Sequence, residues 1–106
     1  MIITNIEYIP NMKVTEQYGV VAGSTVRAKN AVHDLGASFK NFVGGELKAY
    51  TQLLEESRKE AVERMTKQAE ALGANAIINV RFATSAVAGG AAEIYVYGTA
   101  VKAEVA

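Results

Sequence analysis

The clearest pattern along the chain is a helical repeat of hydrophobic positions over about residues 46–72. No proline or glycine interrupts this stretch, and Gly73, the residue type most often found just beyond a helix end, follows it. When successive residues are set about 100° apart, the hydrophobic ones fall in a single stripe about 100° wide. The residues of this stripe are Leu47, Tyr50, Leu54, Ala61, Met65, Ala69 and Leu72. We therefore predict one long amphipathic helix that packs its stripe on a sheet or on another helix.

The opposite surface of this helix is charged. Each of three acids on it lies four residues before a base, a spacing that stabilises a helix by roughly 0.2–0.5 kcal/mol per pair. The pairs are Glu55 with Lys59, Glu60 with Arg64, and Glu63 with Lys67. We expect this surface to face water.

Three runs rich in β-branched and aromatic residues predict strands at 14–22, 76–82 and 93–101. Small residues at 88–91 supply a turn, so the last two strands should form a hairpin. In residues 24–43, apolar residues recur at a loosely helical spacing, but polar residues and a glycine interrupt them. We predict a short helix or irregular segment there. The pattern indicates an α+β fold in which a small antiparallel sheet, made of a strand and a β-hairpin, packs on the long helix.

Composition limits the function more than it defines it. The 106 residues suit a single domain, 1–106, and the eleven Lys and Arg are balanced by eleven Asp and Glu, so we expect no nucleic-acid partner. The absence of cysteine excludes disulfides and thiolate metal sites and fits a reducing compartment. Because the chain begins without a signal-peptide pattern and has no long apolar stretch, we expect a cytoplasmic protein without membrane insertion.

The length of the helix and the character of the strands favour a homo-oligomer. The helix should be about 40 Å long, whereas a domain of this size has a radius of gyration of only about 13 Å. Both faces of the strands are apolar, and one helix cannot cover both. The residues concerned are Ile94, Val96, Tyr95, Tyr97, Tyr18, Val20 and Val21. The strand edges also carry no proline and few charges, so self-association would resolve all three problems. A monomer whose small segment folds over the second face is the alternative.

Arg58 lies at the centre of the apolar stripe, four residues after Leu54 and three before Ala61. A permanently charged guanidinium is costly there unless a carboxylate pairs with it. Its partner would be Glu93, Asp34 or Glu7, from the same or a neighbouring subunit. The favoured interpretation is a structural ion pair, and the alternative is that Arg58 holds an anionic ligand.

Few other residues in the sequence are candidates for metal binding, anion binding or catalysis. His33 and Asp34, joined by Glu46 or Glu93, could ligate a metal if symmetry brought several copies together. The glycines before Glu46 resemble a phosphate loop only in preceding a helix, because no lysine follows them, and a tight helix entry is the favoured interpretation. No Ser/His/Asp set or paired carboxylates stand out, so we name no catalytic residue and do not favour an enzyme.

Several stretches together resemble the YbjQ-like proteins, an uncharacterised bacterial and archaeal family. They are residues 18–23, Asn30 with Asp34, Gly44-Gly45-Glu46 with Tyr50, Arg58 with Ala61 and Met65, residues 73–76, and residues 97–101. The resemblance implies a subunit similar to that of dodecin and a ring, a pentamer that can pair into a decamer. The family is sometimes labelled heavy-metal-binding. Two residues depart from its pattern, His33 where a basic residue is expected and Asn79 where glycine is common.

Three functions follow in order of preference. The first is an oligomeric binding or storage module with a small ligand held between subunits near Tyr18, Tyr95 and Tyr97, and the resemblance to dodecin implies a flat aromatic ligand. The second is a metal-binding protein that uses Asp34, Glu46 and His33 around a ring. The third is an enzyme with a site at a subunit interface, and no cofactor is identified for any of the three.

Overall fold

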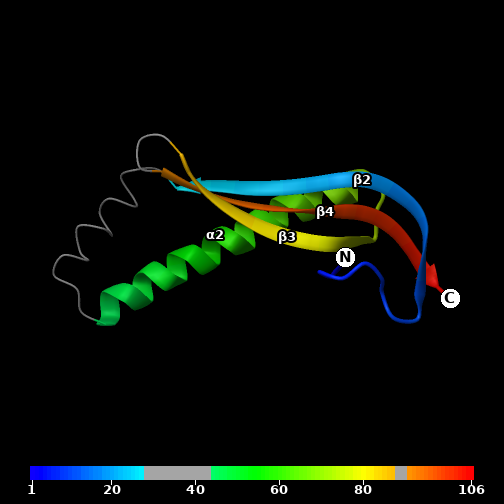
Figure 1. The fold of residues 1–106 in the computed structure, drawn as a ribbon, viewed down its shortest axis with the longest axis horizontal. Helices are drawn as coiled ribbons and strands as arrows, with labels where there is room; N and C mark the ends of the chain where they lie inside the picture. Colours follow the sequence, from blue (N-terminus) through cyan, green and yellow to red (C-terminus); the bar gives the residue numbers. More distant parts are fainter. Residues whose placement is uncertain (28–43, 88–90) are drawn as a thin grey trace.

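The structure, a computed structural model, is an α+β fold in which one helix packs on one face of a four-stranded sheet (Figure 1). It describes residues 1–27, 44–87 and 91–106. The strands lie in the order β1-β3-β4-β2 across the sheet. The elements are β1 (Ile2–Ile3), β2 (Met12–Arg27), α2 (Gly44–Ala71), β3 (Ala76–Val87) and β4 (Ala91–Val105).

The strand, helix and hairpin expected from the sequence are all present. β4 pairs antiparallel with both β2 and β3, and Val87 lies opposite Ala91, which confirms the hairpin. Of the turn predicted at 88–91, Ala91 is the first residue of β4, and 88–90 lie outside the described residues. β1 was not predicted, and it pairs parallel with the start of β3, so the sheet is mixed instead of purely antiparallel.

β2 is longer than predicted because Gly23 does not end it. The strand continues to Arg27, so the prediction of a helical or irregular segment is wrong for residues 24–27, while its remainder, 28–43, lies outside the described residues. A Cβ atom at Gly23 would overlap the carbonyl oxygen of Ala61 and lie 2.6 Å from the nitrogen of Met65. Glycine is therefore required here by the close approach of α2, and it has no role as a turn.

The core lies between α2 and the face of the sheet formed mainly by β2 and β4. Ala61, Met65 and Ala69 of the predicted stripe are fully buried, and Leu54 packs at the margin. The sheet contributes Val21, Ile77, Val80, Ile94, Val96 and Ala100. Leu72 was expected to be buried and is 46 % exposed, because α2 ends at Ala71 and Gly73 turns the chain with a φ of 89°.

The molecule is elongated. Its radius of gyration is 17.1 Å and its extents are 56 × 27 × 17 Å. The 28 residues of α2 span about 42 Å at 1.5 Å per residue. In Figure 1 the C-terminal half of α2 lies across the sheet, while its N-terminal half runs at an angle away from the strands.

A β-bulge decides which way Tyr18 points. The register of β2 and β4 shifts between Gln17 and Gly19, and Gly19 has a φ of 98°. A bulge inserts one residue and so reverses the alternation of side chains on one side of it. As a result Tyr18 packs against the core under α2, whereas Val20 is 72 % exposed on the other face. The expectation that Tyr18 would join Tyr95 and Tyr97 is therefore wrong.

A second bulge, between Ile78 and Arg81, joins the sheet to the N-terminal segment. Asn79 lies at its centre with a φ of 55°, a conformation that glycine adopts without cost and asparagine tolerates. The backbone N–H of Asn79 donates to the carbonyl of Ile6 at 3.0 Å, and that of Val80 donates to Thr4, also at 3.0 Å. A glycine at position 79 would adopt this conformation without strain.

Among the described residues, the face away from α2 is covered only at one end. There a small cluster of Ala76, Ile78, Val101 and Ala103 packs against Ile9 and Met12 of the N-terminal segment and β2. None of the helices in the described ranges is long and apolar enough to cross a membrane. The rest of this face forms the candidate site.

Candidate functional site

The uncovered part of the sheet carries a row of side chains that we call the tyrosine face, made of Ala22, Ser24, Arg81, Ala83, Tyr95 and Tyr97. In the register, Tyr95 lies opposite Ser24 and Ala83, and Tyr97 lies opposite Ala22 and Arg81. Residues directly opposite each other in an antiparallel pair point to the same side of the sheet. Their neighbour Val96 pairs with Gly23, which faces α2, so the tyrosine face is the side away from the helix.

Tyr95 and Tyr97 are in contact. Their ring centroids are 5.6 Å apart and the ring planes are tilted by 32°. Tyr97 is 37 % exposed and Tyr95 is partly buried. Three of the four residues opposite them are Ala22, Ser24 and Ala83, which are too small to cover the rings. The pair therefore offers an aromatic surface to a planar molecule or to another subunit.

One hollow adjoins Tyr95 at the edge of β2. It has a volume of about 300 Å³ and is lined by Ala22, Gly23, Ser24, Arg64 and Tyr95. The guanidinium of Arg64 reaches over from α2 and donates to the carbonyl of Ser24 at 2.6 Å and to Glu60 Oε1 at 2.6 Å. Both terminal nitrogens of this arginine are therefore engaged within the chain.

The same edge is protected by a second side chain of the helix. The Oε1 atom of Gln68 accepts a hydrogen bond of 2.7 Å from the backbone N–H of Ala22. Gln68 and Arg64 thus bond backbone groups of β2 that point away from the sheet and could otherwise pair with another strand. The strand itself carries few charges at this edge, as expected, and the protection comes from side chains of α2. Of the three predicted helix pairs, Glu60 with Arg64 is the ion pair found among the described residues.

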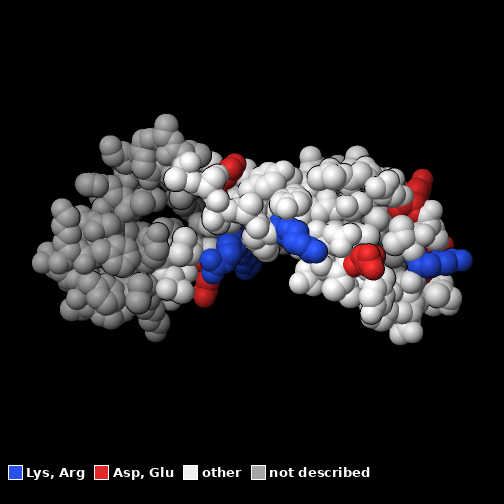
Figure 2. Space-filling view, viewed as in Figure 1, with Lys and Arg blue, Asp and Glu red and all other residues white. Residues whose placement is uncertain are grey.

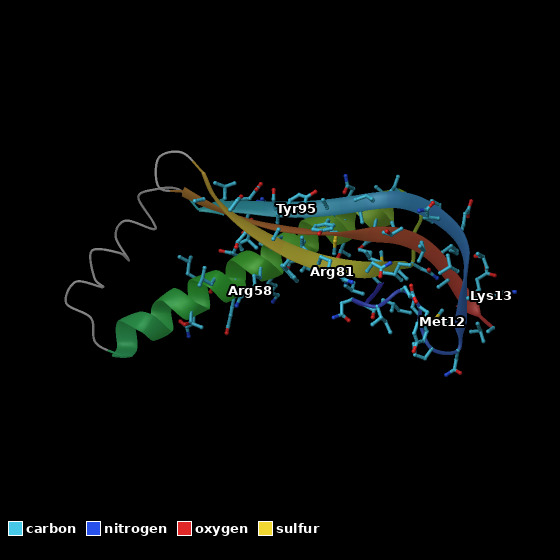
Figure 3. All side chains as sticks on the ribbon, in the orientation of Figure 1. Met12, Lys13, Arg58, Arg81 and Tyr95 are labelled. Atoms are coloured by element: carbon cyan, nitrogen blue, oxygen red, sulfur yellow. The ribbon has the colours of Figure 1, made fainter. Side chains whose placement is uncertain are left out.

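A second hollow lies beside the N-terminal segment. It has a volume of about 320 Å³ and is lined by Asn5, Ile6, Glu7, Tyr8, Asn79 and Arg81. Arg81 Nη1 donates to the carbonyl of Asn5 at 2.6 Å and to that of Val80 at 3.1 Å. Figure 2 shows a basic side chain in the middle of the face in view, and Figure 3 places Arg81 there, beside β3.

Arg58 is exposed on α2, although the stripe placed it at a buried centre. Its neighbour Ser57 is fully buried instead, and the backbone carbonyl of Ser57 accepts a hydrogen bond of 3.1 Å from Thr25 Oγ1. Near the point where α2 leaves the sheet, a different side of the helix contacts the strands. Arg58 therefore lies next to the buried positions of the helix and not among them. Among the described residues Arg58 forms no ion pair, and Glu93 accepts a hydrogen bond from Ser85. Pairing of Arg58 with another subunit stays a prediction.

The structure does not test the predicted metal ligands. His33 and Asp34 lie outside the described residues, as does the side chain of Glu46, whose backbone is in the first turn of α2. The helix begins at Gly44, so the two glycines form its first residues instead of preceding it. Within 1–27, 44–87 and 91–106, no group of three His, Asp or Glu side chains is placed to hold a metal ion.

Tyr18 has a separate environment. Its hydroxyl donates a hydrogen bond of 3.0 Å to Glu16 Oε2. This bond to a carboxylate raises the pKa of Tyr18 above that of a free tyrosine, with smaller contributions in the same direction from desolvation and from the negative charge.

Arg81 was missed from the sequence, since the bulge at Asn79 hides which side of the sheet it faces.

Comparison with known proteins identifies the family. Residues 1–104 match the YbjQ family described as "Putative heavy-metal-binding". A UPF0145 protein of Hahella chejuensis is 60 % identical over 104 residues, which cover 98 % of this chain and 100 % of that protein. A UPF0145 protein of Psychrobacter arcticus is 59 % identical over 101 residues, 95 % of this chain, and this match spans 64 % of that longer relative.

The fold has a counterpart among solved structures. A protein of unknown function from Pediococcus pentosaceus, assigned to the DUF74 family, superposes with a TM-score of 0.64 at 17 % identity. The match covers 98 % of each chain. At this identity the likeness supports the fold alone, and the family assignment rests on the sequence matches. On that evidence the chain belongs to the YbjQ, or UPF0145, family.

Proposed function

We propose that this chain is the subunit of a cytoplasmic homo-oligomeric binding or storage module that holds a small planar ligand on the tyrosine face, between subunits. The observation that carries the proposal is the contacting pair of Tyr95 and Tyr97 on the sheet face that α2 leaves uncovered. Aromatic rings with small neighbours form a flat surface on which another ring can stack. The resemblance to the YbjQ-like proteins suggests a ring of five, or two such rings paired.

Exposed apolar side chains on both sides of the sheet support assembly. Val20 is 72 % exposed, Phe82 50 %, and Val26 55 %. A second subunit that covered them would gain roughly 25 cal/mol for each Å² of apolar surface removed from water. At Ala22 and Ser24, side chains of α2 bond the outer backbone groups of β2. Among the described residues, most of the outer edge of β3 has no such side chain, so its backbone groups are open to another strand.

Native mass spectrometry of untagged protein, combined with elemental analysis, tests the proposal. We expect an oligomer that retains organic mass, and denaturation should release that molecule for identification. An oligomer with stoichiometric metal and no organic mass would contradict the proposed ligand. A polyhistidine tag must be absent because it would introduce the metal ligands that the experiment seeks.

The family description favours a second candidate, a metal site formed by Asp34, Glu46 and His33 around a ring. Neutral imidazole suits zinc and copper, and carboxylates suit harder divalent ions. His33→Ala with Asp34→Ala should then abolish stoichiometric metal in the elemental analysis. The tyrosine-face proposal expects those two substitutions to leave retained organic mass unchanged.

A further inference from the structure

Arg81 is held in a fixed place on the tyrosine face. Nη1 donates to the carbonyls of Asn5 and Val80, so the N-terminal segment and the strand both restrain the guanidinium. An arginine restrained in this way loses little further conformational entropy when it binds a ligand. Its position is therefore prepared before any ligand arrives.

Part of the donor capacity of Arg81 is unused. A guanidinium has five N–H donors, and within the described residues neither Nε nor Nη2 of Arg81 has a hydrogen bond or an ion pair. Arg64, the arginine at the other hollow, differs because both of its terminal nitrogens are engaged. The charge of Arg81 thus remains available at the wall of the 320 Å³ hollow.

The hollow also offers neutral polar groups and one opposing charge. Asn79 and Tyr8 line it and can donate hydrogen bonds, and Tyr8 is 59 % exposed. Glu7 lines it too and would repel an anion. No ion pair joins Glu7 to Arg81 among the described residues, so the arginine is not neutralised there.

Arg81 lies directly opposite Tyr97 in the register, and Tyr97 contacts Tyr95. Side chains that are opposite in this way have Cβ atoms about 4.5–5.5 Å apart. A cation and an aromatic surface are therefore adjacent on one side of the sheet, as Figure 3 shows for Arg81 and Tyr95. A molecule that stacks on Tyr97 can place a substituent at the guanidinium.

We propose that Arg81 binds the carboxylate of a planar aromatic ligand whose ring stacks on Tyr97, with the carboxylate lying in the hollow lined by Asn79 and Tyr8. This inference rests on the proposed function, because it specifies the chemistry of a ligand on the tyrosine face. A carboxylate matches the two unused guanidinium nitrogens and forms the stronger, charge-assisted type of hydrogen bond.

Isothermal titration of the untagged protein in its native assembly, with naphthoate and its neutral analogue naphthamide as probes, tests the proposal. Both probes have the same rings, and only naphthoate carries a charge. We expect naphthoate to bind about tenfold more tightly, which is typical of a hydrogen-bonded charge. The preference should shrink as salt is added, because the site is partly exposed to solvent.

Four variants locate the charge preference. Arg81→Gln should abolish the preference for naphthoate, while Lys13→Gln, a cation at the far end of the sheet in Figure 3, should retain it. Tyr97→Leu should weaken both probes to a similar degree. Glu7→Gln should strengthen naphthoate binding about threefold, since it removes a repelling charge, and misfolding cannot produce a gain of this kind.

The outcomes separate the two proposals. Equal binding of naphthoate and naphthamide, weakened by Tyr97→Leu, would overturn the role of Arg81 and leave the aromatic face intact. A preference for naphthoate that survives Arg81→Gln would also overturn the role of Arg81. Failure of both probes to bind would overturn this inference, and retained organic mass in the native spectra would still support the proposed function.

Discussion

At the scale of single residues, the contact between helix and sheet depends on the missing side chain of Gly23. Gly23→Ala would place a methyl group against the Ala61 carbonyl and the Met65 nitrogen, which are backbone atoms and cannot move aside alone. We expect a loss of about 3 kcal/mol in the free energy of unfolding, since overpacking of this kind forces the elements apart. Urea denaturation followed by circular dichroism measures it.

The neighbouring substitution Ser24→Ala is the control, because Ser24 points to the tyrosine face and its side chain is only partly buried. It should change the free energy of unfolding by no more than about 0.5 kcal/mol. If both substitutions destabilised equally, strand propensity would explain the effect and the close approach of α2 would not.

The pKa of Tyr18 gives a prediction about pH. Since this pKa is raised in the folded protein, the Tyr18 contribution to stability is fully present below the ordinary tyrosine pKa of about 10. It is lost as pH rises through the higher folded pKa. Tyr18→Phe should therefore flatten the loss of stability above pH of about 10, measured by thermal unfolding across that range.

Spectroscopic titration supplies a check on the same residue. In the wild-type protein, near-ultraviolet absorbance should show an ionisation step for Tyr18 above the pH expected of a free tyrosine, because its pKa is raised, and Tyr18→Phe should remove that step. If Glu16→Gln left the step in place, the hydrogen bond to Glu16 would not be its cause.

At the scale of elements, α2 protects the edge of β2 through side chains instead of backbone. Gln68→Ala removes the acceptor of the Ala22 N–H and should cost about 1 kcal/mol. It should also accelerate hydrogen exchange of the Ala22 amide and promote edge-to-edge association of subunits.

Lys67→Ala is the matched control, since Lys67 is exposed one position earlier on the same helix. Its effect on stability should stay within about 0.5 kcal/mol, and the Ala22 amide should exchange as in the wild type. Equal exchange in the two variants would mean that Gln68 does not protect the strand.

The elements themselves could be predicted because their signals are local. Hydrophobic periodicity located α2 to within two residues at its start, and β-branched runs located all three long strands. β1 has only two residues, too few for any pattern, and its pairing with β3 depends on contacts distant in sequence. Gly23 appeared to end a strand because sequence alone does not distinguish a turn glycine from one that admits a helix.

The candidate site was harder to predict because bulges change the alternation on which such reasoning depends. Tyr95 and Tyr97 were assigned to the same face correctly, since β4 is regular between them. Tyr18 was assigned to that face wrongly and Arg81 was overlooked, because the bulges at Gly19 and Asn79 lie beside them. Arg58 was assigned to the stripe by angle alone, which takes no account of where the helix leaves the sheet.

At the scale of the whole molecule, the elongated shape supports the proposed homo-oligomer. The sheet is covered on one side by part of a helix, and exposed apolar residues remain on both of its faces. We expect sedimentation at micromolar concentration to give a species several times heavier than the 11.3 kDa chain. A stable monomer under those conditions would contradict the assembly.

Tyr95→Lys extends this experiment by placing a charge on the tyrosine face. Removal of a central aromatic contact typically costs 2 kcal/mol or more, so we expect the dissociation constant of the assembly to rise at least about tenfold. Lys67→Ala again serves as the control on the helix surface. An unchanged assembly in Tyr95→Lys would place the subunit contacts elsewhere.

The close contact at Gly23 also bears on how the molecule could respond to occupancy. Gly23 contacts α2 and also lines the hollow beside Tyr95, which Arg64 of α2 borders as well, so the strand and the helix both adjoin this hollow. Because backbone atoms of Ala61 and Met65 lie directly against Gly23, this strand cannot move toward α2 unless the helix moves with it.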